Sequence, residues 1–378
     1  MTRQVVVIDV VGLTPRLLRK MPRLRSLPLT RNLETVLPAV TCSAQATFLT
    51  GALPSSHGIV GNGWYFRDLG EVLLWRQHNR LIQGEKVWDI ARRSDPSYKV
   101  ANVCWWYAMG AETDLLVTPR PIYYADGRKA PDCYTRPVAL HDRLTSRLGD
   151  FPLFNYWGPT ASIKSSQWIV DAACDILATD SPDLLLTYVP HLDYDLQRYG
   201  ASSVEATRAA IELDAVLAPL LDDAAARDAT VVVLSEYGIT DVSRPVDVNR
   251  LLRREGLLEV HTQDGMEYLD PFASRAFAVA DHQIAHVYVR DPADLDAVAK
   301  LLSGLPGVAE VLDAEGKKRH GLDHERAGEL VIVSEPDSWF TYYYWLDDAR
   351  APDFARAVEI HRKPGYDPAE LFFDPTDP

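Results

Sequence analysis

The stretch Gln4-Val5-Val6-Val7-Ile8-Asp9-Val10 is a run of β-branched residues that reaches an aspartate near its end. A continuous apolar run of this length is typical of a parallel strand that is buried on both faces. Residues 183–190 and 230–234 show the same pattern, and a long helical pattern over residues 204–227 separates them. Strands that alternate with helices predict an α/β fold, with a doubly wound, mainly parallel sheet flanked by helices.

The remainder of the chain adds elements but no linker that would divide it. Residues 246–258 and 294–302 have helical patterns, and short strand patterns follow them. Residues 64–180 are rich in aromatic and turn residues, which we interpret as an inserted region that completes the sheet and walls a pocket. There is no internal repeat or low-complexity segment. We therefore expect a single domain over residues 1–378.

Composition narrows the class of protein. Hydrophobic residues make up 47% of the 378 residues, which is ordinary for a soluble protein. The formal net charge of −14 argues against a protein that coats nucleic acid. No apolar run approaches a membrane span, and the first residues lack a secretory pattern. The four cysteines are scattered without a CxxC pair, as in a reducing compartment: Cys42, Cys104, Cys133 and Cys174. We expect a cytoplasmic protein without nucleic-acid or membrane partners, and its oligomeric state stays open.

Residues 36–51 place a hydroxyl where a nucleophile would be useful. Thr41 follows a short apolar run and precedes about two turns of helix that Gly51 closes. A threonine at a helix start can simply cap the helix by hydrogen bonding to its backbone, with no further role. Alternatively, the free N–H groups and the dipole of that helix start would bind an anion beside the hydroxyl. Both interpretations stay open at this point.

A glycine-punctuated loop follows at residues 54–64. Asn62 stands 21 residues after Thr41, in a segment that could fold back beside it. Flanked by Gly61 and Gly63, Asn62 can equally be a turn residue that tolerates a left-handed backbone.

Carboxylates follow the apolar strands. Asp9, Asp193 and Glu236 each stand at or just after the end of one such strand, and the carboxyl ends of parallel strands meet at one edge of a sheet. If residues 191–195 are extended, His191 and Asp195 would share a face with Asp193. Three carboxylates together with Thr41 and a late histidine predict a two-metal phosphoryl-transfer site.

The sequence resembles the alkaline phosphatase superfamily, specifically its type I phosphodiesterase/nucleotide pyrophosphatase branch, which includes phosphonoacetate hydrolase. Five matches keep the order of that family and span nearly the whole chain. They are Val-Ile-Asp ending at Asp9, Leu-Pro-Ala-Val-Thr with Leu-Thr-Gly over residues 37–51, His-Gly-Ile-Val-Gly-Asn over residues 57–62, Ser-Glu-Tyr-Gly over residues 235–238, and His-x-x-x-Gly-Tyr-Asp over residues 361–367.

The resemblance implies roles for the matching residues. Thr41 would be the nucleophile, and Asn62 would hold a phosphate oxygen. Two divalent metal ions, zinc in that family, would be bound by residues in two groups. The first group is Asp9, Thr41 and Glu236, and the second is Asp193 and His361. The substrate would be a small phosphorylated or phosphonate molecule.

Two positions depart from the family pattern. The second metal motif is Asp-x-x-x-His in the family, and here Gln197 replaces the histidine. The family's Asp-His pair is here a glutamate followed by Tyr237. An amide is a poor zinc ligand, and a phenol binds a metal only after losing its proton.

Three explanations of these departures stay open. Gln197 and Tyr237 could be ligands of a harder ion such as Mg²⁺, Mn²⁺ or iron. Other histidines could take their places, with His191, His282 and His286 as the candidates. One ion could also be lost.

The sequence thus predicts a metal-dependent hydrolase of a phosphodiester, phosphomonoester or phosphonate that acts through a covalent phospho-threonine. In that mechanism Asn62 and the Cys42 N–H stabilise the equatorial oxygens. The alternative is a diverged, non-catalytic binder of a phosphorylated metabolite or partner, which the altered positions Gln197 and Tyr237 favour.

Overall fold

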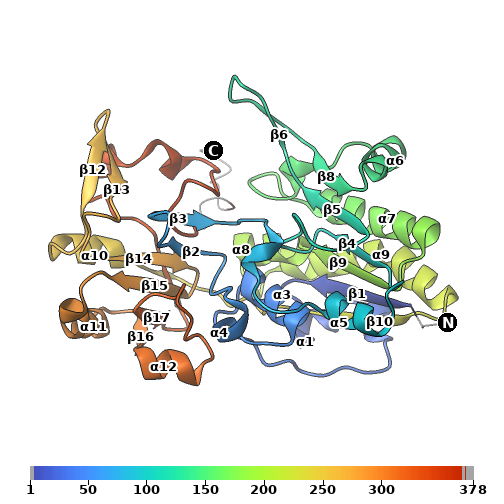
Figure 1. Cartoon of the computed structure of the whole chain (residues 1–378), viewed down its shortest axis with the longest axis horizontal. Coiled ribbons are helices and arrows are strands. Elements are labelled where there is room, and N and C mark those ends of the chain that lie inside the picture. The colour runs from blue at the N-terminus through green and yellow to red at the C-terminus, as the bar shows by residue number, and fades with distance from the viewer. Residues whose placement is uncertain (1–3, 368–370, 372–378) are drawn as a thin grey trace.

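The computed structural model describes residues 4–367 and residue 371. Two large sheets lie in separate halves of the molecule (Figure 1). The larger one has six strands in the order β10-β1-β9-β4-β5-β8. The strands are β1 (Val5–Val10), β4 (Val100–Val103), β5 (Leu115–Pro119), β8 (Cys133–Arg136), β9 (Leu184–Val189) and β10 (Thr230–Leu234).

Most pairs in this sheet are parallel. Strand β1 pairs in parallel with β9 and β10, and β4 pairs in parallel with β9 and β5, whereas β8 is antiparallel to β5. Asp9 lies opposite Tyr188 and Leu234, so the carboxyl ends of the three neighbouring apolar strands β10, β1 and β9 coincide. The predicted α/β fold with a mainly parallel sheet is confirmed. The description of the chain as one domain stays a prediction.

Helices cover both faces of the six-stranded sheet. The side chains of β1 alternate between two cores, as a strand between two helical layers requires. Ile8 packs in a core with residues of α7 and α9, whereas Val7 lies against a second core that contains residues of α3 and α5. These helices are α3 (Thr41–Thr50), α5 (Val87–Ser94), α7 (Ile163–Asp180) and α9 (Val204–Ala226).

The second large sheet has four antiparallel strands and its own core, in the order β14-β15-β17-β16. It lies on the left of Figure 1 with its helices. Its strands are β14 (Ala276–Asp281), β15 (Ile284–Val289), β16 (Val308–Leu312) and β17 (Leu330–Ser334), and its helices are α10 (Val248–Arg254), α11 (Leu295–Ser303) and α12 (Ala314–Arg319).

Shorter elements complete the described part of the chain. The strand pairs are β2 (Gly63–Phe66) with β3 (Glu71–Leu74), β6 (Ile122–Tyr123) with β7 (Lys129–Ala130), β11 (Arg244–Val246) with β18 (Ser338–Phe340), and β12 (Val260–Gln263) with β13 (Met266–Leu269). The helices are α1 (Pro15–Leu18), α2 (Pro22–Arg25), α4 (Pro54–His57), α6 (Val138–Leu148) and α8 (His191–Tyr199).

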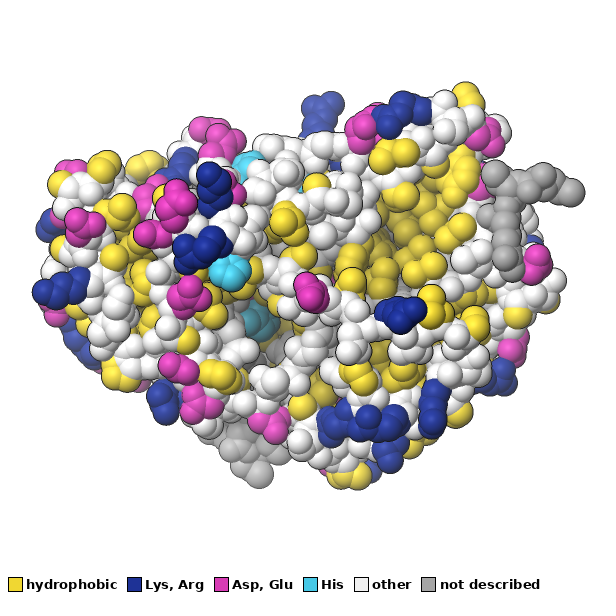
Figure 2. Space-filling model, turned by 90° about the horizontal axis from the view of Figure 1, so that it is seen from below, with side chains coloured by type: hydrophobic (Ala, Val, Ile, Leu, Met, Phe, Trp, Pro, Cys, Tyr) yellow, Lys and Arg dark blue, Asp and Glu magenta, His cyan; other side chains and the backbone are white. Residues whose placement is uncertain are grey.

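Two local expectations are wrong. The segment after β9 is not extended but forms helix α8, so Asp193 shares a helical face with Gln197 four residues later instead of alternating with His191. Strand β10 is not buried on both faces, because it is the edge strand of the sheet; Val232 is 40% exposed. In the half of the molecule that contains the six-stranded sheet, apolar side chains gather in a hollow of the surface (Figure 2). A sequence run of valines does not reveal whether a strand has one neighbour or two.

In the part of the chain that the structure describes, no helix is both long and apolar enough to cross a bilayer.

Candidate active site

Thr41 is the first residue of α3, at the carboxyl edge of the six-stranded sheet. Val40 is the cap residue, and the Thr41 hydroxyl instead donates a hydrogen bond to Glu236 Oε2 over 3.0 Å. The Tyr237 hydroxyl lies 3.2 Å from the same Oγ1 atom. Because only 4% of Thr41 is exposed, its hydroxyl is committed to this polar cluster rather than to solvent.

Asp9 lies near the end of β1 and Glu236 follows the neighbouring strand β10, and one amide nitrogen bridges the two carboxylates. Gln45 Nε2 donates to Asp9 Oδ2 over 3.1 Å and to Glu236 Oε1 over 2.6 Å. The Trp106 backbone N–H donates to Gln45 Oε1, which fixes the direction of the amide. Sequence reasoning missed Gln45. Its spacing of four residues from Thr41, on one face of a helix, was the available signal.

Burial and mutual proximity set the electrostatics of these carboxylates. Burial and the neighbouring carboxyl of Glu236 raise the pKa of Asp9 well above its usual range. Burial likewise raises the pKa of Glu236 to about 7. Among the described residues, no ion pair joins a lysine or arginine to Asp9, Glu236 or Asp193. Buried charges of one sign require either protons or a bound cation.

Asp193 is held by its own helix and by the C-terminal segment. Gln197 Nε2 donates to Asp193 Oδ2 over 2.8 Å, as the spacing of four residues on α8 allows. The Tyr366 hydroxyl donates to Gln197 Oε1. Burial raises the pKa of Asp193, and hydrogen bonds from Gln197 and Tyr237 together with the charge of His282 act against that rise. Sequence reasoning also missed Tyr366, because the motif at residues 361–367 was interpreted only through His361.

Asn62 does fold back beside Thr41. Helix α3 anchors the intervening loop, since Ser43 Oγ donates to the Ile59 carbonyl over 2.8 Å. Asn62 Oδ1 then accepts the Cys42 N–H over 3.0 Å. Asp281 holds the other side of Asn62, accepting from its Nδ2 over 3.0 Å and from its backbone N–H over 2.7 Å. The Cys42 N–H, expected to face a substrate oxygen, is therefore bonded to Asn62.

The neighbours of the predicted site residue His361 lie outside the cluster around Thr41. Its backbone N–H donates to Glu359 Oε1 over 3.1 Å. Burial lowers the pKa of its imidazole, and the other groups that act on that pKa are Glu359, Arg76, the backbone of Leu74 and Lys129. No described contact joins His361 to Asp193.

The three alternative histidines lie in different surroundings. His286 is fully engaged, because its Nε2 bonds to the Val60 carbonyl and its Nδ1 accepts the Gly328 N–H. His191 Nε2 lies 3.4 Å from Glu212 Oε2 on α9. His282 Nδ1 lies 2.9 Å from Asp281 Oδ1, and its ring stacks on Tyr366 with centroids 3.6 Å apart.

The donors near Thr41 fit a hard divalent cation. Asp9 Oδ1 is buried and has no hydrogen-bond partner, the carboxyl of Glu236 acts on Asp9, and Thr41 Oγ1 lies 3.0 Å from Glu236 Oε2. Carboxylate and hydroxyl oxygens are the ligands that Mg²⁺ and Mn²⁺ prefer. In the second predicted group Gln197 engages Asp193 Oδ2, and Asp193 Oδ1 is likewise buried without a hydrogen-bond partner, so each group presents one free carboxylate oxygen.

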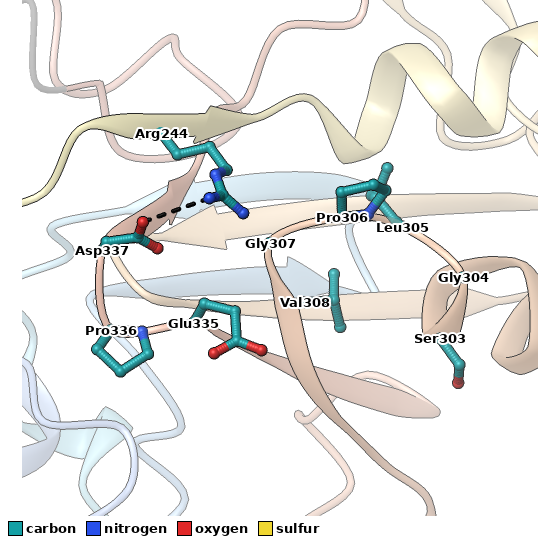
Figure 3. A pocket seen from close by; sticks show the side chains of 10 residues that line it. All are labelled: Arg244, Ser303, Gly304, Leu305, Pro306, Gly307, Val308, Glu335, Pro336 and Asp337. Atoms are coloured by element: carbon teal, nitrogen blue, oxygen red, sulfur yellow. Dashed lines mark hydrogen bonds and ion pairs between the residues drawn. The ribbon is translucent and has the colours of Figure 1, made fainter.

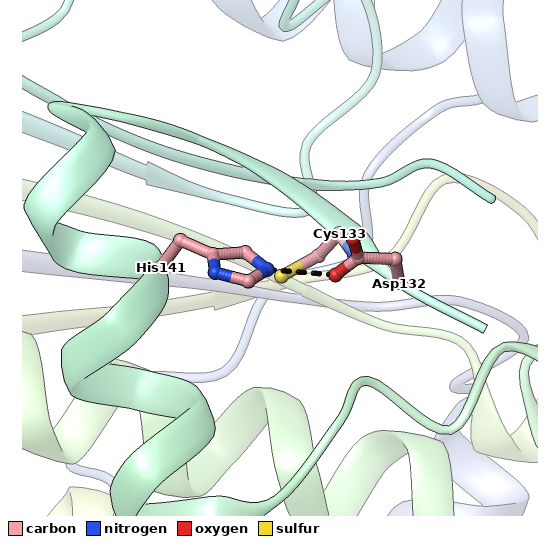
Figure 4. A group of neighbouring side chains, drawn as sticks. All are labelled: Asp132, Cys133 and His141. Carbon is pink, nitrogen blue, oxygen red and sulfur yellow. Dashed lines mark hydrogen bonds and ion pairs between the residues drawn. The ribbon is translucent and has the colours of Figure 1, made fainter. Parts of the chain in front are cut away.

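Two other features of the surface lie away from these residues. A pocket of about 610 Å³ is formed by loops next to β16 and β18, with Arg244 paired to Asp337 across it, and none of the predicted site residues lines it (Figure 3). Asp132, Cys133 and His141 form a compact group near β8 and α6 (Figure 4). His141 bonds to Asp132 over 2.8 Å, and burial raises the pKa of the Cys133 thiol to about 12, which keeps the thiol protonated.

The fold and the arrangement at its sheet edge define an α/β protein of the alkaline phosphatase-like type. The chain belongs to the type I phosphodiesterase/nucleotide pyrophosphatase family, whose pattern matches residues 5–367. The resemblance seen in the sequence is thereby confirmed.

Individual relatives are distant. An uncharacterised pyrophosphatase/phosphodiesterase of Schizosaccharomyces pombe is 25% identical over 251 residues, which are 64% of this chain and 43% of that protein. The chain therefore spans less than half the length of this relative. The structure of phosphonoacetate hydrolase from Sinorhizobium meliloti, in complex with phosphonoacetate, superimposes with a TM-score of 0.65 at 19% identity, covering 90% of this chain and 83% of that one. Murine ectonucleotide pyrophosphatase/phosphodiesterase 5 gives a TM-score of 0.59 at 16% identity, covering 98% and 86%.

Proposed function

We propose that the protein hydrolyses a phosphodiester, phosphomonoester or phosphonate through a covalent phospho-threonine on Thr41. The observation that carries this proposal is the hydrogen bond from Thr41 Oγ1 to Glu236 Oε2, inside a cluster of three buried carboxylates at the sheet edge. Membership of the family supports the reaction class. The solved relatives were captured with small ligands, phosphonoacetate in one case and AMP in an inactive variant of the other, which supports a small phosphorylated or phosphonate substrate.

Each residue of the cluster has its own role in the proposed reaction. Thr41 Oγ1 forms a bond to phosphorus while the bond to the leaving group breaks. Glu236 Oε2 takes the hydroxyl proton, which passes on to the leaving group. Water then breaks the Oγ1–phosphorus bond, returning a hydroxyl to Thr41 and releasing the product. The start of α3 and the second amide hydrogen of Asn62 face the charge on the phosphoryl oxygens.

A divalent cation fits the donors Asp9, Glu236 and Thr41. Bound there, it would supply positive charge that lowers the pKa of the threonine hydroxyl and screens the phosphoryl group.

The direct test is turnover of chromogenic phosphomonoesters and phosphodiesters and of phosphonoacetate by wild type, Thr41→Ala and Thr41→Ser, each with Mg²⁺, Mn²⁺ or Zn²⁺. We expect Thr41→Ala to lose turnover to background and Thr41→Ser to retain part of it. Acid quenching followed by peptide mass spectrometry should find a phosphoryl group on Thr41 in the wild type. Turnover by Thr41→Ala at the wild-type rate contradicts the mechanism.

One observation favours the non-catalytic binder as a second candidate. The Cys42 N–H, which would otherwise face a phosphoryl oxygen, is bonded to Asn62 Oδ1. A binder should show saturable binding of AMP or phosphonoacetate by calorimetry, unchanged in Thr41→Ser, with no turnover on any substrate of the panel.

A further inference from the structure

Asp132, Cys133 and His141 bring three kinds of ligand atom together at one side of the six-stranded sheet, beside its last strand β8 (Figure 4). A carboxylate oxygen, the thiol sulfur and an imidazole nitrogen all lie within 4.8 Å of one another. Within residues 4–367 and residue 371, no other group of three or more His, Cys, Asp or Glu side chains converges in this way. Tetrahedral ligands of one zinc ion, at bond lengths of about 2.0–2.3 Å, lie about 3.5 Å apart. Small rotations of these side chains therefore suffice to bring all three atoms onto one ion.

The local fold brings these residues together. Cys133 is the first residue of β8, and His141 is the fourth residue of α6, which packs against that strand. Backbone groups fix the position of Asp132: its Oδ1 accepts the Cys133 N–H over 2.8 Å, and its carbonyl accepts the Arg120 N–H over 3.1 Å. The carboxylate and the thiol are thus held by the sheet, and the imidazole is held by the helix.

The imidazole of His141 is oriented as a metal ligand requires. Its Nε2 lies 2.8 Å from Asp132 Oδ1, and its Nδ1 lies 3.4 Å from Asp142 Oδ1. Histidines that bind a metal through one ring nitrogen usually direct the other nitrogen at a carboxylate or a carbonyl. With Nε2 on an ion, the remaining ring proton of a neutral His141 would sit on Nδ1, facing Asp142.

The negative charge at this group is not balanced by a basic side chain. Asp132 and Asp142 each pair with the His141 ring. In the described part of the chain, no recorded ion pair joins either carboxylate to a lysine or an arginine. A bound cation would supply the missing positive charge.

The donor set selects the class of ion, and its exposure allows the ion to enter. Thiolate and imidazole ligands favour zinc, whereas Mg²⁺ and Ca²⁺ prefer oxygen ligands alone. Cys133 is only 5% exposed, but the side chains of Asp132 and His141 are 26% and 31% exposed. Solvent can therefore reach the group and provide a fourth ligand.

We propose that Asp132, Cys133 and His141 bind one zinc ion, with water as the fourth ligand, and that this ion ties the start of β8 to α6. On binding, the Cys133 thiol releases its proton to solvent, and its sulfur takes up the ion as a thiolate. Four strand spacings separate β8 from β1, about 19 Å of sheet at about 4.8 Å per strand. The site is thus distinct from the cluster around Thr41, and it does not rest on the proposed function.

Cobalt absorption spectroscopy tests the site through its sulfur. The full chain is stripped with a chelator and titrated with Co²⁺ alone, and the charge-transfer absorption of a cobalt–thiolate bond is followed. We expect this band to reach its maximum at one thiolate-bound ion per chain and to disappear when Zn²⁺ is added. Ions bound only by oxygen and nitrogen, including any near Thr41, do not produce it.

Variants assign the band to its residues. Cys133→Ser should abolish it, and His141→Ala should bind Co²⁺ at least ten-fold more weakly. Asp132→Asn, which keeps an oxygen for the Cys133 N–H, should also weaken binding and covers the case in which Cys133→Ser does not fold. The matched controls are Cys174→Ser, at a partly buried free thiol, and the exposed His320→Ala, and neither should change the titration.

Thermal denaturation gives a second readout that does not depend on absorption. Because an ion that binds only the folded state stabilises it, Zn²⁺ should raise the Tm of the wild type more than that of His141→Ala. Absence of the thiolate band in the wild type overturns the proposal. So does a band that persists in Cys133→Ser, a band of equal affinity in His141→Ala, or an equal rise in Tm for the two proteins.

Discussion

The hydroxyl of Thr41 donates to Glu236 Oε2 over 3.0 Å, although 195 positions of sequence separate the two residues. The sheet produces this contact. Strand β10 delivers Glu236 beside β1, and α3 begins at the same edge. The candidate nucleophile and its proton acceptor therefore meet because two distant segments share one edge of a parallel sheet.

Replacing Gln45 by Leu should destabilise the protein, since it removes the single nitrogen that bridges Asp9 and Glu236. Buried groups left without partners cost about 1–3 kcal/mol each. Urea unfolding should show a loss in that range, partly recovered by added Mn²⁺, because a cation can neutralise the freed carboxylates. The exposed Gln263→Leu on β12 is the control and should leave the midpoint unchanged. A Gln45→Leu protein as stable as wild type contradicts this account of the cluster.

Asp281→Asn should impair turnover of whichever substrate the panel identifies. Asp281 accepts hydrogen bonds from both the backbone and the side chain of Asn62, and an amide can accept at only one of its two terminal atoms. Misplacing a group that holds the phosphoryl oxygens should lower kcat by about 10²-fold. Steady-state kinetics with the exposed Asp264→Asn as control would measure this, and equal kcat values for the two variants would refute the positioning role.

His286 should make stability depend on pH. Burial lowers its pKa to about 4, against an ordinary value near 6.5 in the unfolded chain. Between about pH 6.5 and pH 4 the His286 imidazole therefore binds a proton in the unfolded state but stays neutral in the folded state. The contribution of His286 to the free energy of unfolding is fully present above pH 6.5 and is lost as the pH falls from 6.5 to 4. It amounts to about 1.4 kcal/mol for each unit of the difference between the two pKa values.

The test compares urea unfolding of wild type and His286→Gln at pH 7.5 and pH 5. The variant should lose less stability than the wild type over this interval, even if it is less stable at pH 7.5. His57 and His191, whose pKa values burial also lowers to about 4, are unchanged in both proteins and cancel in the comparison. Parallel pH profiles would show that His286 is not a source of the dependence.

Asp214 and Asp222 on α9 form a matched pair for stability. Asp214 is buried and accepts the backbone N–H groups of Arg23 and Leu24, each over 3.0 Å. Asp222 pairs with the Arg23 side chain in solvent, with both side chains more than half exposed. Asp214→Ala should lower the unfolding free energy by about 1–3 kcal/mol, and Asp222→Ala by less than about 1 kcal/mol. Chemical denaturation of both variants measures the two losses, and the reverse order would be inconsistent with this structure.

Much of the fold follows from local pattern. The apolar run at residues 5–10 predicted a strand covered on both faces, and it pairs in parallel with the two other apolar runs. The edge position of β10 and the helical form of residues 191–199 were not predictable, because both depend on which elements lie alongside. Local propensity does not specify neighbours.

The sequence by itself determined the sheet, the carboxylates that follow its strands and the hydroxyl of Thr41 at a helix start. Tertiary structure alone decided the partners of these groups. It placed Gln45 between Asp9 and Glu236, and it put Tyr366 rather than His361 against Gln197. The physical reason is that strand and helix patterns arise from residues close in sequence, whereas a hydrogen bond is set by distances of about 3 Å that only the packing of remote segments establishes.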